Sequence, residues 1–240
     1  MPSLQGAAGW INSEPLDANA LHGKVVAVDF WTYTCINWMR TAPYLRTWAS
    51  KYKDAGLVVI GVHSPEFAFE QDPERVRRFT VAMDLGFPVA IDSQHAIWRA
   101  FHNQYWPALY LVDEQGRIRH QQFGEGDYDK AEAVIQALLK EAGARNVDTT
   151  IAPIIGEGPE AAANWSNLKS PETYTGYSRT ERFASPGGIV QSERHVYSVR
   201  DCSTTNGRSR AIGRSRRRRR VQTRARRACS IASMRVTCTW

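Results

Sequence analysis

The sequence VDFWTYTCINWMRTAPY, residues 28–44, decides the fold of this chain. It overlaps an apolar, β-branched run at residues 24–31, which is typical of a strand buried on both faces. From Cys35 to Tyr52 the apolar residues recur at intervals of three and four, which predicts an amphipathic helix with a kink at Pro43. A single cysteine therefore stands where a strand ends and a helix begins.

The flanking sequence repeats this alternation of short apolar runs and helical periodicity. Further strands are predicted at residues 57–63, 87–92, 107–113 and 117–123, and further helices at residues 72–86, 93–102 and 128–143. Strand and helix thus alternate until two consecutive strands and a closing helix end the pattern. This order predicts an α/β fold with a mixed central sheet and helices on both faces.

Composition divides the chain into four parts. Residues 1–19 are expected to be an N-terminal extension, and residues 20–143 the folded domain. Residues 144–199 are rich in Gly, Pro, Ser and other polar residues, which is typical of a linker leading into the truncated start of a C-terminal module. Residues 200–240 are rich in arginine and lack apolar periodicity, so this tail is predicted to be disordered.

The formal net charge of +7 comes from that tail. Residues 200–240 hold 13 of the 31 basic residues and one of the 24 acidic residues, which leaves 18 basic and 23 acidic side chains in residues 1–199. A run such as RSRRRRR binds phosphate groups through charge alone, whatever the nucleotide sequence. No aromatic residue interrupts the run, so no specific nucleic-acid partner is expected.

The sequence also bears on compartment, metals and cofactors. The N-terminus, MPSLQGAAGWINSEPL, has neither a basic start nor a continuous apolar stretch, so it predicts no secretory signal and a cytoplasmic location stays open. No apolar run approaches the ~20 residues of a membrane-spanning helix. The six histidines lack ligand spacing and are better explained as surface or cap residues, so no metal and no cofactor is expected.

Cys35 has the setting of a reactive thiol. Unpaired backbone N–H groups at a helix N-terminus stabilise a thiolate, so the pKa of Cys35 is expected to be lowered. Asp29 lies in the middle of an apolar strand, where an ionisable side chain is costly unless it has a task such as proton transfer. Trp106 and Pro107 begin another strand, where a cis peptide bond would hold backbone atoms opposite the nucleophile.

Several separate strings carry a family resemblance: FWTYTCIN, TAPYLRTWASKY, HSPEF, QYWPALYLVD and SPETYTGYSRTERFASPGG. Through them the chain resembles thioredoxin-fold proteins of the TlpA/ResA group, and more specifically the soluble thioredoxin-like domain of DipZ-type proteins. The resemblance implies a thioredoxin-like fold with an insertion at residues 64–92. It also implies an extracytoplasmic location (periplasm or cell envelope), protein thiols and disulfides as partners, a CcdA-type membrane electron donor, and a link to cytochrome c biogenesis.

The same resemblance assigns roles to residues. It implies that Cys35 is the attacking nucleophile, that Asp29 is the buried acid, and that Pro107 is the cis-proline. Trp106 and Pro107 would then border the substrate groove. The surrounding active-site motif comprises Trp31, Thr32, Thr34, Ile36, Asn37 and Trp38.

One departure from the family affects the chemistry. The family pattern Cys-Ile-Asn-Cys reads Cys-Ile-Asn-Trp at residues 35–38, and the next cysteine is Cys202. Because the second thiol normally cleaves the mixed disulfide formed by the first, intramolecular dithiol exchange is expected to fail. Trp38 has three interpretations: a structural plug, a substrate-facing aromatic residue, or a single-base error in a Cys codon. The resemblance stops near residue 190, and the Arg-rich tail that follows is interpreted as the product of a shifted reading frame.

The sequence is consistent with three functions. Thiol-disulfide exchange through Cys35 is the leading hypothesis. The spacing Thr32-x-x-Cys35 is also that of one-cysteine peroxidases, in which the threonine hydroxyl orients a peroxide. The third candidate is a non-enzymatic module that holds extended peptides around Trp31, Trp38, Trp106 and Pro107. The reaction product at Cys35 distinguishes the three functions. Exchange gives mixed disulfides with protein cysteines and a peroxidase gives a sulfenic acid, whereas a binding module would be unaffected by Cys35→Ser.

Overall fold

The computed structural model describes residues 1–151, 153–154, 156–164 and 187–190, and the backbone of four short strands further along the chain. It divides the chain into two compact units, Met1–Ala162 and Ala163–Trp240. In the second unit, β7 (Thr173–Tyr174) pairs with β10 (Val236–Thr237), and β8 (Arg194–Val196) pairs with β9 (Ile212–Arg214). The remainder of the predicted C-terminal module and Arg-rich tail lies outside the described residues.

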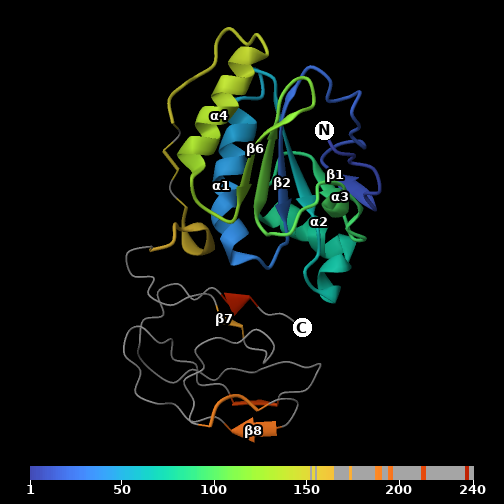
Figure 1. Ribbon diagram of the computed structural model, residues 1–240, viewed down its shortest axis with the longest axis vertical. Helices are drawn as coiled ribbons and strands as arrows, with labels where there is room; N and C mark the ends of the chain where they lie inside the picture. The colour runs from blue at the N-terminus through green and yellow to red at the C-terminus, as the bar shows by residue number, and fades with distance from the viewer. Residues whose placement is uncertain are drawn as a thin grey trace. The chain divides into compact units, whose positions relative to one another are not determined.

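A six-stranded mixed sheet forms the centre of the first unit, as predicted (Figure 1). The strand order is β1-β4-β3-β2-β5-β6. Strands β2, β3 and β4 are parallel to one another, β5 is antiparallel to β2, and β6 is antiparallel to β5. The strands are β1 (Gly9–Ile11), β2 (Val25–Trp31), β3 (Leu57–His63), β4 (Val89–Ile91), β5 (Ala108–Val112) and β6 (Ile118–Phe123).

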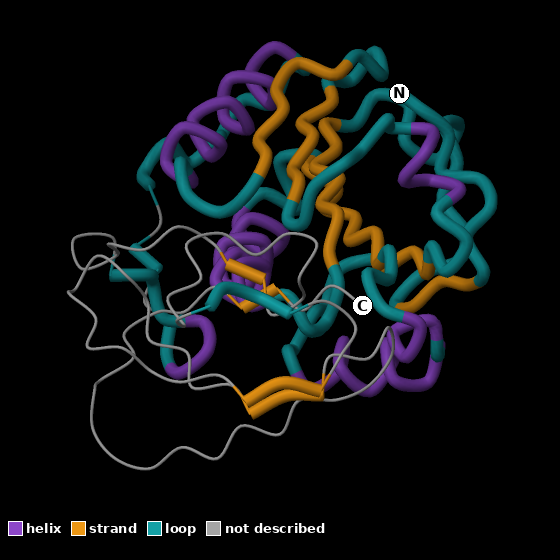
Figure 2. Tube along the Cα trace, turned by 60° about the horizontal axis from the view of Figure 1, so that its bottom comes forward, coloured by secondary structure: helices purple, strands orange, loops and turns teal. Residues whose placement is uncertain are grey.

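Helices cover both faces of this sheet, which confirms the predicted layers (Figure 2). Apolar residues of α1, α2 and α4 share one core, and those of α3 share the other with the N-terminal segment. No helix in the described part of the chain is long and apolar enough to cross a membrane. The helices are α1 (Ile36–Lys51), α2 (Pro73–Ala82), α3 (Ala96–Ala100) and α4 (Tyr128–Glu141), with short 3₁₀ turns η1 (Ala68–Gln71) and η2 (Gly158–Glu160).

Strand β2 positions the candidate site, because it is buried along its whole length in the middle of the sheet. Successive side chains of a strand point to opposite faces. Val26, Val28 and Phe30 accordingly pack in the core on the α3 side. The alternate residues face α1, so Asp29 and Trp31 lie under the helix that begins directly after Cys35.

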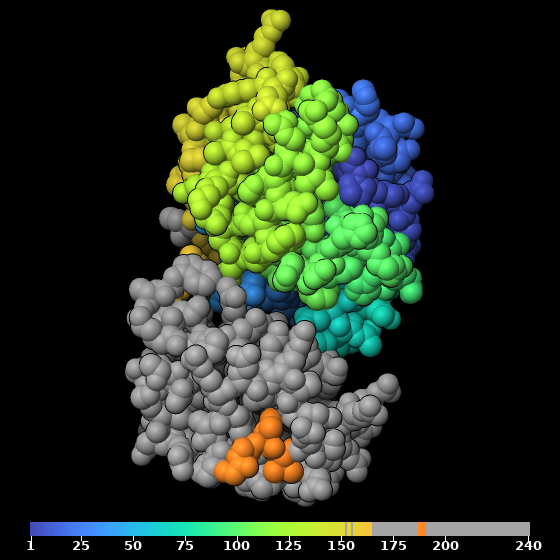
Figure 3. Space-filling model, viewed as in Figure 1, coloured from blue at the N-terminus to red at the C-terminus, as the bar shows by residue number. Residues whose placement is uncertain are grey.

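The N-terminal residues, predicted to be an extension outside the folded domain, are part of the sheet. Strand β1 pairs antiparallel with β4 and forms one edge of the sheet. Figure 3 shows this segment in dark blue on the surface beside the green region that contains α3. Gly6 has a φ of 93°, and a Cβ atom there would come within 2.6 Å of Ala96 Cβ, so only glycine allows this approach.

Two helices are shorter than the sequence predicts, for identifiable reasons. Helix α2 ends at Ala82 rather than near residue 86, because Asp84 adopts a left-handed φ of 50°. Helix α3 begins only at Ala96. The Asp92 carboxylate fixes that start by accepting hydrogen bonds from the backbone N–H groups of Ile97 and Trp98.

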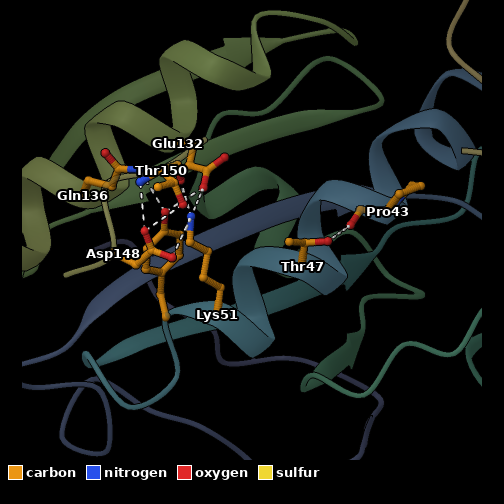
Figure 4. A network of polar contacts seen from close by, with 8 residues as sticks. Pro43, Thr47, Lys51, Glu132, Gln136, Asp148 and Thr150 are labelled. Carbon is orange, nitrogen blue, oxygen red and sulfur yellow. Dashed lines mark hydrogen bonds and ion pairs between the residues drawn. The ribbon is translucent and has the colours of Figure 1, made fainter. Parts of the chain in front are cut away.

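Residues after α4 pack against α1, although the sequence predicts a linker from residue 144. Lys51 at the end of α1 forms ion pairs with Glu132 of α4 and with Asp148, and it donates to the carbonyl of Thr150 (Figure 4). Further along, Arg46 of α1 holds the Glu160 carboxylate with two hydrogen bonds of 2.8 and 2.7 Å. The first unit therefore extends through Ala162.

Helix α1 continues through Pro43, where the sequence predicts a kink. Proline has no N–H group to donate within the helix. One turn later the hydroxyl of Thr47 donates a 2.9 Å hydrogen bond to the Pro43 carbonyl, as Figure 4 shows.

Candidate active site

Cys35 is the N-cap residue of α1, as predicted, and its side chain is 8% exposed. Its Sγ lies 3.9 Å from the carbonyl oxygen of Trp106, and the Trp106–Pro107 peptide bond is cis, also as predicted. The structure thus brings together the strand–helix junction and the start of β5, two segments that are 71 residues apart in sequence. A molecule that reacts at Sγ would meet the Trp106–Pro107 backbone at the same time.

Burial raises the pKa of the Cys35 thiol to about 12. Hydrogen bonds from the backbone N–H groups of Trp38 and Asn37 lower this pKa, whereas the nearby carboxylates of Glu66 and Glu125 raise it. The expectation of a lowered pKa is therefore wrong for the folded chain. Removing a thiolate from water costs more free energy than the hydrogen bonds from the two N–H groups at the helix end contribute.

Trp38, which stands where the family has its second cysteine, is fully buried. Its indole stacks on Trp31 with the ring centres 4.2 Å apart, and its Nε1 donates a 2.7 Å hydrogen bond to Oδ2 of Asp29. Phe79 of α2 packs beside the stacked pair. Trp38 is therefore a structural plug in this conformation, and the interpretation as a substrate-facing aromatic is wrong.

Asp29 is fully buried, and burial raises the pKa of its carboxyl group well above the usual range of aspartate. The hydrogen bond from Trp38 acts in the opposite direction and is the weaker effect. Oδ1 has no hydrogen-bond partner among the described residues. The predicted buried acid is thus present, but its bonded neighbour is an indole and not a thiol.

The other motif residues divide between core and surface. Thr32 is fully buried, and its hydroxyl has no partner among the described residues. Thr34 is exposed and donates a 2.5 Å hydrogen bond to Glu70, while Ile36 is half-buried. Asn37 is buried and accepts a long hydrogen bond, 3.5 Å, from Arg40.

The loop between β3 and α2 supports both sides of the site, although none of its residues was predicted to belong to the site. Trp106 Nε1 donates a 2.9 Å hydrogen bond to the carbonyl of Ser64. Glu70 is fully buried and accepts hydrogen bonds from the backbone N–H groups of Glu66 and Phe67 as well as from Thr34. No periodic pattern marks Glu70, and an acidic residue in a loop is normally exposed.

One histidine contradicts the expectation of surface or cap positions. His63 is 1% exposed at the end of β3, and burial lowers the pKa of its imidazole to about 3. Its ring lies edge-on to Trp31 and parallel to Tyr33. Within the described residues, no group of three or more His, Cys, Asp or Glu side chains is placed to hold a metal ion.

Comparisons with known proteins agree with this geometry. The profile described as the AhpC/TSA family matches residues 3–121. The chain is 40% identical to protein DipZ of Mycobacterium tuberculosis over 191 residues, which cover 78% of this chain and 27% of DipZ. It is 31% identical to the thiol-disulfide oxidoreductase YkuV of Bacillus subtilis over 141 residues, 59% of this chain and 95% of YkuV. The chain thus spans about a quarter of the length of DipZ.

Solved structures show the same fold. A thioredoxin-like protein in its oxidized form superposes with a TM-score of 0.54 at 32% sequence identity, covering 59% of this chain and 95% of that protein. The thioredoxin-like superfamily protein SPOA0173 gives the same TM-score at 25% identity. The predicted thioredoxin-like fold is therefore confirmed.

Proposed function

Because this chain belongs to the thioredoxin-like thiol-disulfide oxidoreductases of the TlpA/ResA type, we propose that it reacts with protein thiols and disulfides through Cys35. The position of the Cys35 Sγ, at the start of α1 and 3.9 Å from the Trp106 carbonyl, carries this proposal. An extended substrate segment bound beside Trp106 and Pro107 would present its cysteine to that sulfur.

The reaction begins with the Cys35 thiolate. It attacks one sulfur of a substrate disulfide, so a bond between Cys35 and that sulfur forms while the substrate S–S bond breaks. The second substrate sulfur leaves as a thiolate, and the proton lost by Cys35 passes to solvent or to that leaving thiolate. Cys35 is oxidised to a mixed disulfide, and the released substrate cysteine is reduced.

The reaction then stops at the mixed disulfide, because Trp38 stands in place of the second cysteine. In a dithiol enzyme the second cysteine would attack Cys35 Sγ and release the substrate. The buried indole cannot do this, so the mixed disulfide persists until an external thiol, from a small molecule or a partner protein, attacks it. The chain would therefore act as a one-thiol acceptor that holds its substrate covalently.

The similarity to DipZ also suggests a cellular location and an electron donor. We extend the proposal to an extracytoplasmic location and to a CcdA-type membrane protein as electron donor, both by analogy with DipZ-type proteins. An external thiol supplied by such a donor would take the place of the missing second cysteine. Exposing intact cells to a membrane-impermeant thiol reagent tests the location, because only a protein outside the cytoplasm is labelled.

Trapping the intermediate tests the central step. In the full chain carrying Cys202→Ser, Cys229→Ser and Cys238→Ser, only Cys35 remains as a thiol. Incubation with insulin should give a covalent adduct of the two proteins on a non-reducing gel, and added dithiothreitol should remove it. The matched control also carries Cys35→Ser. The absence of an adduct, when unfolded chain alkylates normally at Cys35, would overturn the proposal.

The peroxidase alternative makes a different prediction at the same thiol. It requires the hydroxyl of Thr32 beside a peroxide, but Thr32 is fully buried. Exposure to peroxide followed by a sulfenic-acid reagent would label Cys35 if the chain is a peroxidase. A non-enzymatic peptide-binding module would bind its peptides equally well with Cys35→Ser.

A further inference from the structure

Three neighbouring parallel strands, β2, β3 and β4, end at one edge of the sheet. Cys35 lies after the end of β2, Ser64 directly follows β3, and Asp92 directly follows β4. The register of β3 and β4 places Ser64 next to Asp92, and both residues are fully buried. The Ser64 hydroxyl donates a 2.9 Å hydrogen bond to Oδ2 of Asp92. The edge of the sheet that carries the thiol therefore also contains a buried carboxyl group.

The Asp92 carboxyl group joins two separate segments at this edge. Besides the Ser64 hydroxyl, it accepts hydrogen bonds of 3.0 and 2.9 Å from the backbone N–H groups of Ile97 and Trp98 at the start of α3. Burying a carboxyl group is costly unless hydrogen bonds compensate it, so these three contacts are needed together. They fix Ser64 on one side of Asp92 and the first turn of α3 on the other.

Both of these segments contact the indole of Trp106. The Ser64 carbonyl accepts a 2.9 Å hydrogen bond from Trp106 Nε1. The ring of Trp98 packs on the ring of Trp106 with the ring centres 4.2 Å apart. The carbonyl oxygen of Trp106 in turn lies 3.9 Å from Cys35 Sγ. Two routes thus connect the Asp92 carboxyl group to the backbone beside the thiol.

Resting on the proposed function, we propose that Asp92 is a positioning residue for exchange with polypeptide substrates. It holds the Trp106 indole through Ser64 and Trp98. The backbone of Trp106 and Pro107 is thereby fixed relative to the thiol. An extended substrate would bind that backbone through main-chain hydrogen bonds, so its cysteine reaches the thiol only when the backbone is in place. A misplacement of about 1 Å can slow such a reaction about 100-fold.

A small disulfide needs only the thiol, whereas a polypeptide also needs the backbone beside it. Two compounds separate these requirements: N-acetylcysteine and a short extended peptide, each with thionitrobenzoate bound to its cysteine as a mixed disulfide. In both, the Cys35 thiolate attacks the cysteine sulfur and forms a new disulfide with it, and the Cys35 proton passes to solvent. Thionitrobenzoate leaves as a coloured thiolate, so Cys35 is oxidised and thionitrobenzoate is reduced. The ratio of the two rates, the peptide preference, therefore reports the contribution of the polypeptide.

Variants are made in the full chain in which Cys35 is the only thiol. Asp92→Asn should lower the peptide preference about tenfold, because an NH₂ group replaces one oxygen and at least one of the three donors loses its acceptor. Ser64→Ala removes only the hydroxyl and should lower the preference about threefold. The rate with N-acetylcysteine should stay close to that of the parent in both variants. Ser64→Ala also provides the test if Asp92→Asn does not fold.

Two matched variants control for a general loss of stability. Asp113→Asn alters another buried aspartate that directly follows a strand and accepts hydrogen bonds from two backbone N–H groups. Because β5 is antiparallel to β2, Asp113 lies at the opposite edge of the sheet from Cys35. Thr80→Val removes a buried hydroxyl that donates to the Val76 carbonyl within α2. Neither variant should change the peptide preference.

A double-mutant cycle tests the route through Trp106. Trp106→Phe removes the indole N–H that donates to Ser64 and should itself lower the peptide preference. If Asp92 acts through this indole, Asp92→Asn should lower the preference less in the Trp106→Phe background than in the parent. Equal effects in the two backgrounds would show that Asp92 does not act through Trp106 and would overturn the inference.

The remaining outcomes separate this inference from the proposed function. An unchanged peptide preference in Asp92→Asn and Ser64→Ala, together with a normal insulin adduct, would overturn the inference and leave the proposed function intact. So would a fall of equal size in the two control variants, or a parent chain that reacts equally fast with both compounds. Failure of Cys35 in the parent chain to react with insulin and with both compounds would instead overturn the proposed function.

Discussion

The indole Nε1 of Trp38 donates a 2.7 Å hydrogen bond to the carboxyl oxygen Oδ2 of Asp29, and both side chains are fully buried. An acid in the middle of the central strand is thereby satisfied, in part, by the residue that occupies the place of the second cysteine. The contact explains how the fold accommodates a large side chain at this position. Because Trp38 fills this place and bonds to Asp29, the core stays packed although the chain has lost the thiol that would resolve a mixed disulfide.

Trp38→Phe keeps a ring that can stack on Trp31 but removes the N–H donor to the buried Asp29 carboxyl group. The loss of that donor should lower the free energy of unfolding by about 1–3 kcal/mol. Urea unfolding measures this free energy. In a double-mutant cycle, Asp29→Leu, which removes the acceptor, combined with Trp38→Phe should cost less than the sum of the single changes. Additive costs would show that the hydrogen bond contributes nothing to stability.

Asp29 should make the folded state less stable as pH rises. Its pKa is raised on folding, so the folded state holds a proton that the unfolded state releases from about pH 4 upward. The stabilisation is complete below that pH and is lost as pH approaches the folded-state pKa. Asp29→Asn cannot titrate, so its stability relative to the parent chain should increase from about pH 4 upward. A constant difference between the two proteins at all pH values would contradict this prediction.

Cys35 should alkylate slowly at neutral pH. With a pKa of about 12, only about one thiol in 10⁵ is a thiolate at pH 7. The rate with iodoacetamide should therefore continue to rise with pH beyond pH 10, whereas the same thiol in urea-unfolded chain should level off above its ordinary pKa of ~8.5. The three other cysteines are replaced by serine for this measurement. A plateau near pH 8 in folded protein would show that the thiol is not desolvated.

The sequence predicts strands and helices best where burial imposes a simple pattern. Strand β3 coincides with its predicted residues 57–63, because a central parallel strand is apolar throughout. Strand β1, by contrast, is three residues long and has no periodicity of its own, and it becomes a strand only by pairing with β4. Its existence depends on a tertiary contact that local sequence does not encode.

The candidate site was predictable in its position but not in its electrostatics. The motif around Cys35 locates the thiol at the start of α1 and next to Pro107. The pKa, however, depends on how far Sγ is removed from water, which is a property of the assembled core. Glu70 was not predicted for a similar reason, because the Thr34 hydroxyl that joins it to the site lies 36 residues away in sequence.

Trp38→Cys should restore turnover at the expense of stability. The new thiol would lie one helical turn from Cys35, so the chain should reduce insulin catalytically when dithiothreitol is supplied. Replacing a fully buried tryptophan by a small side chain leaves a cavity, at a cost of about 3–5 kcal/mol. Trp38→Ala creates a similar cavity without a thiol and is the control. Equal insulin-reduction rates in the two variants would mean that more than the second thiol has been lost.

The hydrogen bond between Thr34 and Glu70 should control access to Cys35. Thr34→Val removes the hydroxyl and deprives Oε1 of the buried Glu70 of this donor, which should cost about 1–3 kcal/mol and loosen the turn before the thiol. Because desolvation is the main cause of the raised Cys35 pKa, a loosened turn should expose Sγ and speed its alkylation at pH 7.

Two further variants separate this effect from general destabilisation. Thr34→Ser keeps the hydroxyl and should retain slow alkylation. Thr47→Val also removes a threonine hydroxyl from α1, one that donates to the Pro43 carbonyl more than two turns from Cys35, and it should leave the alkylation rate unchanged. Faster alkylation in Thr34→Val alone would identify the hydrogen bond as the restraint on the thiol. Equal rates in all three variants would mean that the packing around Cys35, and not the bond to Glu70, keeps the sulfur buried.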